Sequence, residues 1–165
     1  MLNIKLSAYL LTIVGLSLGV IAIPAIATAP AEHSHGHTGA PTALTLDAGK
    51  KWATDTPLRQ AMTNVRNAVS ESLPAIHSGK FSAAEYDALA TKVNGEVNYM
   101  VGNCKLQPAA DAQLHLVIAR MLEGVAAMEG KTSDTKRQQG VVNVIGALND
   151  YSIYFDHPGW LPVKH

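Results

Sequence analysis

Cysteine is almost absent from this chain: Cys104 is the only one among 165 residues. An internal disulfide is therefore excluded, and so is ordinary covalent haem attachment through a C-x-x-C-H motif. A lipid anchor at a signal-cleavage point is also disfavoured, because that processing needs a cysteine at the cleavage point. The thiol of Cys104 is then a buried small hydrophobe, an intermolecular link or a metal ligand.

Net charge is lacking as well, because 13 basic and 13 acidic side chains balance. The chain thus has no overall charge to steer it toward nucleic acid or an acidic membrane surface. Catalytic patterns are missing too: no Ser/His/Asp arrangement, phosphate-cradling glycine loop or convergent carboxylate pair stands out. We therefore expect a protein that is not an enzyme, and we look for its function in local sites.

Residues 1–31 have a different composition from the rest of the chain. After Lys5 the apolar run "LSAYLLTIVGLSLGVIAIPAIA" begins, and no charged residue follows until Glu32. The small-x-small patterns "AIA" and "APA" predict cleavage of a signal peptide near residue 27 or 31. An uncleaved anchor is the alternative, because ~20 apolar residues can span a bilayer. We expect a periplasmic protein whose mature form does not span the membrane.

Residues 32–48 are rich in Ala, Pro, Thr, Gly and His and show no apolar period, which indicates a flexible tether. The segment "HSHGH" carries the tether histidines, His33, His35 and His37. Clustered imidazoles bind copper, nickel or zinc weakly, although a histidine-containing linker can also be merely solvated. We take the tether histidines as accessory metal ligands.

Residues 49–165 show helical periodicity in four stretches and no strand-like alternation. The expected helices run from an N-cap at Thr56 to Gly79, from the capping box at Ser82 to Cys104, from Pro108 to Gly130, and from about Ser133 to Phe155. Short connections make neighbouring helices antiparallel, so the predicted fold is an all-α, up-down-up-down four-helix bundle.

This topology places several sulfur and imidazole side chains at one end of the bundle. The starts of the first and third helices meet the ends of the second and fourth there, which gathers Met62, Met100, Cys104, His115 and His157. Met100 and Cys104 share a face because helical residues four apart are neighbours. His115 leans back toward the same end, although its place on the helical wheel is on the flank of the third helix.

Thiolate, thioether and imidazole together are the ligands of electron-transfer copper sites, and the sulfur ligands also suit Cu(I) carriage. Zinc is less well matched, since methionine is a poor zinc ligand. The leading hypothesis is one copper ion bound by Cys104, Met100 and His115, with His157 or Met62 completing the coordination. A redox protein or a copper chaperone would be its partner.

Each of these residues also has an ordinary structural role. A lone cysteine or a methionine on an apolar helix face is commonly core, and a histidine on a flank can bond a carbonyl. A metal-free periplasmic interaction or stress protein is therefore one alternative. A wide apolar face on the third helix, which includes Leu116, Val117 and Leu122, leaves room for a homodimer.

A second alternative comes from the segment "YFDHPGW", which places His157 at the end of the fourth helix. A methionine early in the first helix with a histidine at the end of the fourth resembles the axial pair of the soluble b-type cytochrome four-helix bundles. That resemblance implies a haem b electron carrier with Met62 and His157 as axial ligands.

The segments "LDAGKKWATDTPLRQAM", "NCKLQPAADAQLH" and "YFDHPGW" together resemble a family of small exported bacterial four-helix-bundle proteins of unassigned function. The resemblance covers nearly all of the mature chain. It implies the bundle fold and export, and it implies no activity.

Overall fold

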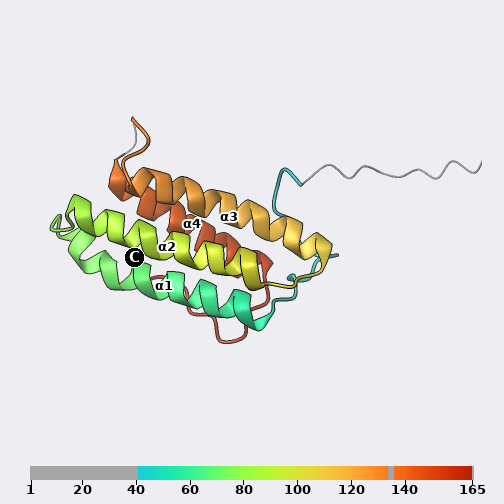
Figure 1. Ribbon diagram of the computed structural model, residues 1–165. Helices are drawn as coiled ribbons and strands as arrows, with labels where there is room; N and C mark the ends of the chain where they lie inside the picture. Colours follow the sequence, from blue (N-terminus) through green and yellow to red (C-terminus); the bar gives the residue numbers. More distant parts are fainter. Residues whose placement is uncertain (1–40, 134–135, 165) are drawn as a thin grey trace, which may run out of the picture. The chain divides into compact units, whose positions relative to one another are not determined.

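The computed structural model describes residues 41–133 and 136–164, and these form four α-helices without a β-strand (Figure 1). The helices are α1 (Thr56–His77), α2 (Ala83–Asn103), α3 (Pro108–Met128) and α4 (Arg137–Tyr154). The predicted all-α four-helix fold is thus confirmed. None of the described helices has the length and apolarity needed to cross a membrane. The expected signal peptide and the tether histidines lie outside the described residues.

The helix starts follow local sequence signals, with two differences from the prediction. The capping box of α2 is present, with Ser82 and Glu85 each bonding the other's backbone N–H. In α1 the N-cap is Asp55 rather than Thr56, because the Asp55 carboxylate accepts a hydrogen bond from the Leu58 N–H at 2.9 Å. In α4 the helix begins at Arg137, later than the expected start near Ser133.

The apolar stripes predicted for the four helices form the core. Each helix contacts its neighbours around the bundle, since α1 packs on α2 and α4, and α3 packs on the same two helices. The largest fully buried side chains are Leu58, Met62, Met100, Leu114, Met121, Met128, Leu148, Tyr151 and Phe155. Because these residues come from all four helices, one continuous core holds the bundle together.

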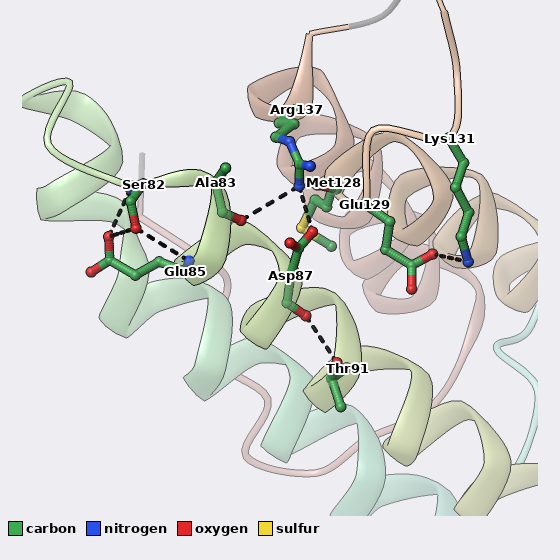
Figure 2. Close-up of polar contacts among 9 residues, drawn as sticks. All are labelled: Ser82, Ala83, Glu85, Asp87, Thr91, Met128, Glu129, Lys131 and Arg137. Atoms are coloured by element: carbon green, nitrogen blue, oxygen red, sulfur yellow. Dashed lines mark hydrogen bonds and ion pairs between the residues drawn. The ribbon is translucent and has the colours of Figure 1, made fainter.

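One end of the bundle is closed by Arg137, the first residue of α4 (Figure 2). Its guanidinium donates to the Asp87 carboxylate at 2.5 Å and to the carbonyl of Ala83, both in the first turns of α2. It also donates to the carbonyl of Met128, the last residue of α3. Three helix ends therefore meet at one side chain, which we call the Arg137 clasp.

At the opposite ends of the same helices, the segment before α1 pairs with the end of α4 and the segment after it. The Trp52 N–H donates to the Tyr154 carbonyl and the Asp156 N–H donates to the Trp52 carbonyl, each at 2.8 Å. The Asp55 carboxylate also accepts from the Lys105 N–H at 2.6 Å. The start of α1 thus lies beside the ends of α2 and α4. We call this part of the molecule the Cys104 end.

The packed part of the chain begins before residue 49, where the tether was expected to stop. Leu44 packs against the core, and the Thr45 N–H donates to Oε1 of the buried Gln113 at 2.7 Å. The Trp52 indole N–H in turn donates to the Thr45 carbonyl. These contacts were not predictable from local composition because they depend on a side chain of α3.

Candidate metal centre

A pocket of about 420 Å³ lies between the end of α2 and the start of α3. Three of the five predicted ligands line it: Met100, Cys104 and His115. Asp111, from the first turn of α3, lines it as well. The structure therefore brings the side chains of the leading hypothesis to one pocket.

The sulfur side of the pocket is fixed by the last turn of α2. Met100 is 1% exposed and belongs to the core, whereas Cys104 is only partly buried. Cys104 is the C-cap residue, one position beyond the expected helical turn, but its N–H still bonds the Met100 carbonyl at 2.9 Å. This bond keeps the two residues one turn apart, so both sulfur-bearing side chains reach the same pocket.

The thiol of Cys104 is strongly held in its neutral form. Burial raises the pKa of the Cys104 thiol to about 12, together with the charge of Asp55, a hydrogen bond to Asp55, and the charge of Asp111. The thiol is therefore protonated at neutral pH and is a poor nucleophile. A metal that binds this sulfur must displace the proton.

The imidazole of His115 occupies the exposed rim of the pocket, in agreement with its predicted flank position. Its side chain is 64% exposed, and Nδ1 lies 2.8 Å from the carbonyl oxygen of Asp111. Because a carbonyl oxygen only accepts, Nδ1 carries the hydrogen and Nε2 keeps a free lone pair. This is the arrangement by which a second-sphere carbonyl orients a metal-binding histidine.

The other two predicted ligands do not line this pocket. Met62 is fully buried in the core. The Nδ1 atom of His157 lies 2.9 Å from the Tyr151 hydroxyl, and its ring packs against Trp160 with 5.0 Å between ring centroids. A haem held by Met62 and His157 would require the packing around Met62 to open, so this geometry does not favour the haem interpretation.

His157 nevertheless lies near α1. Burial lowers the pKa of His157, and the positive charges of Arg59 and Arg66 lower it further. Arg59 and Arg66 flank Met62 along α1, so the segment after α4 lies over the first turns of α1.

Two acidic residues at the Cys104 end were missed in the sequence. Asp55 connects the start of α1 to the backbone of Lys105 and to the Cys104 thiol. Its signal was an aspartate two residues before Pro57, a preferred N-cap position. Asp111 orients His115, and its signal was the spacing of four residues on one helix face.

His, Cys, Asp and Glu side chains alone do not make a metal site in the described part of the chain. Within residues 41–133 and 136–164, no three His, Cys, Asp or Glu side chains are gathered so that they could hold a metal ion. A metal in the pocket would need the thioether of Met100 beside the thiolate and the imidazole. That donor set suits Cu(I) and fits zinc poorly.

The comparisons with known proteins identify no relative. No protein-family model matches the chain, and neither a curated protein nor a solved structure is detectably similar to it.

Proposed function

We propose that this chain is an exported, periplasmic, up-down-up-down antiparallel four-helix bundle that binds one Cu(I) ion. The ligands are the Met100 thioether, the Cys104 thiolate and Nε2 of His115. The observation that carries the proposal is that all three side chains line one pocket at the Cys104 end. The function is copper handling, and neither Met62 nor His157 is part of the coordination.

The chemistry of the three donors supports copper in its reduced state. A thiolate with a thioether is a soft set that selects Cu(I), and one imidazole completes a three-donor site. Asp111 supports the site from the second sphere, because its carbonyl fixes the His115 tautomer and leaves Nε2 free. The Cys104 proton is released when the ion binds.

The test is a Cu(I) titration against a competing chromogenic chelator under anaerobic conditions. The full exported chain is used with the tether histidines replaced by alanine, so that only the pocket is measured. We expect one Cu(I) per chain. C104A and M100L should weaken binding more than the ~10–100-fold loss that follows removal of an outer-sphere partner.

Matched controls come from the predicted ligands that lie outside the pocket. M62L removes a buried thioether and H157Q removes an imidazole, and both should leave Cu(I) affinity unchanged. The copper proposal would be wrong if C104A kept tight, stoichiometric binding. A visible spectrum of protein purified from the periplasm distinguishes the alternatives, because a Soret band indicates haem and elemental analysis without metal indicates a metal-free protein.

A further inference from the structure

The three side chains of the pocket differ sharply in exposure. Met100 is 1% exposed, Cys104 is partly buried, and the His115 side chain is 64% exposed. The three donors therefore form a gradient from the core to solvent. A Cu(I) ion held by them would have sulfur on its inner side and the imidazole on its outer side.

The innermost donor, Met100, and the outermost donor, His115, are held by very different surroundings. Met100 packs in the core with side chains from the other helices, so moving it would open a cavity. Among the described residues, the polar contacts of the His115 ring are those of Nδ1 with Asp111, 2.8 Å to the carbonyl and 3.5 Å to the carboxylate. An exposed side chain with one local anchor can rotate away without disturbing the bundle.

We infer that the pocket passes Cu(I) to an acceptor by ligand exchange that begins at His115. The inference rests on the proposed copper site. A thiolate or thioether of an acceptor protein enters from the exposed rim, the bond from copper to its sulfur forms, and the bond from copper to His115 Nε2 breaks. Copper stays Cu(I) throughout, so no oxidant or reductant is needed. Met100 and Cys104 remain bound during this first step.

This order of events assigns the protein to copper delivery rather than to storage. A storage site would surround the ion with buried donors, whereas here the donor that an incoming ligand replaces, His115, is exposed to solvent. Val101 lines the same pocket and is 68% exposed, so an apolar side chain is available at the rim for contact with the acceptor.

The test compares how affinity and transfer rate respond to each donor. The full chain with the tether histidines replaced by alanine is loaded with Cu(I) and mixed with the chelator bathocuproine disulfonate in a stopped-flow instrument. We expect a rate that rises in proportion to chelator concentration. H115A should lower affinity by about tenfold and raise the transfer rate constant by about the same factor, since the lost bond is already broken in the transition state.

M100L is the contrasting variant and H77A is the matched control. Met100 stays bound during the first step, so M100L should lower affinity and leave the transfer rate constant unchanged. His77 is exposed in the last turn of α1, and H77A should change neither quantity. A rate independent of chelator concentration, or a rate constant that responds to M100L and not to H115A, would overturn the exchange order. Failure of the parent chain to bind Cu(I) would instead overturn the proposed function.

Discussion

His157 is held in its neutral form by the residues around it. Burial raises the pKa of the Tyr151 phenol well above its usual range, so the hydroxyl stays protonated, and it lies 2.9 Å from His157 Nδ1. Burial also lowers the pKa of His157, and Arg59 and Arg66 oppose a further positive charge, while Asp156 acts in the opposite direction. A protonated imidazole has no acceptor nitrogen, so protonation would leave the Tyr151 hydroxyl unable to donate to His157.

This arrangement predicts a loss of stability in mild acid. The unfolded chain binds a proton at His157 near its ordinary pKa of about 6.5, whereas the folded chain resists it until lower pH. Stability is therefore lost as pH falls below about 6.5 and down through the lowered folded pKa. Urea unfolding at about pH 7.5 and about pH 5.5 should show a smaller acid loss for H157Q than for the parent protein.

The exposed His77 supplies the control for this measurement, because it lies in the last turn of α1, away from Tyr151 and His157. H77Q should lose as much stability in acid as the parent protein. An equal acid loss in H157Q would show that other groups, and not His157, account for the pH dependence.

At the scale of helices, the apolar period of the sequence correctly predicted which helix faces are buried. In α1 the helical period predicts one apolar face, and because a helix with one apolar face has a single way to bury it, all of its residues are buried. They are Leu58, Met62, Val65, Val69, Leu73 and Ile76. The sequence also predicted that Met100, Cys104 and His115 lie at one end of the bundle, and these three residues line one pocket between α2 and α3, which the sequence did not predict.

The features that were missed depend on contacts distant in sequence. The N-cap role of Asp55 had a local signal, but its bond to the backbone of Lys105, in another loop, was not predictable. The start of α4 was placed too early, since the Arg137 clasp fixes it through carbonyls and a carboxylate of α2 and α3. Local sequence patterns do not predict hydrogen bonds to partners that are distant in the sequence.

The close approach of α3 to α4 was not part of the sequence prediction, because it depends on two glycines, Gly124 and Gly140. A Cβ atom on Gly140 would lie 2.4 Å from the Gly124 carbonyl oxygen and 2.6 Å from the Met128 nitrogen. A Cβ on Gly124 would lie 2.6 Å from the Gly140 carbonyl oxygen. These are backbone atoms, so relief requires the two helices to separate.

We predict that G140A destabilises the bundle. Alanine gains about 1 kcal/mol of helix propensity over glycine, but overpacking at this contact should cost about 1–3 kcal/mol and outweigh it. Gly95 in α2 is the matched control, since nothing lies within 4 Å of its Cβ position, and G95A should stabilise. Chemical denaturation measures both, and an increase in unfolding free energy for G140A would contradict the close approach.

At the scale of the whole molecule, the Arg137 clasp and the Cys104 end have different roles. The Arg137 clasp joins three helix ends through one guanidinium, and the groups that it bonds are oxygen acceptors rather than the sulfur and imidazole donors of the pocket. At the Cys104 end, Asp55 and Trp52 connect the start of α1 to the ends of α2 and α4, and the pocket lies there. The whole length of the bundle separates them, so damage at the clasp should leave the proposed copper site intact.

R137Q tests this separation. The variant removes a charged group with three acceptors, and it should lower the free energy of unfolding by about 1.5–3 kcal/mol. Cu(I) at ~100 times its dissociation constant should still stabilise R137Q by about 2.7 kcal/mol, as it should the parent protein, because binding to the folded state alone adds a fixed free energy.

The measurement is chemical denaturation of both proteins with and without Cu(I), in chains whose tether histidines are replaced by alanine. K131Q is the control for a charge change near the clasp, because the Lys131 side chain is 68% exposed and its ion pair with Glu129 should contribute little. C104A should lose the copper stabilisation while keeping the clasp. If R137Q lost the stabilisation instead, the two ends would be coupled through the core, and the pocket would depend on the packing of the whole bundle.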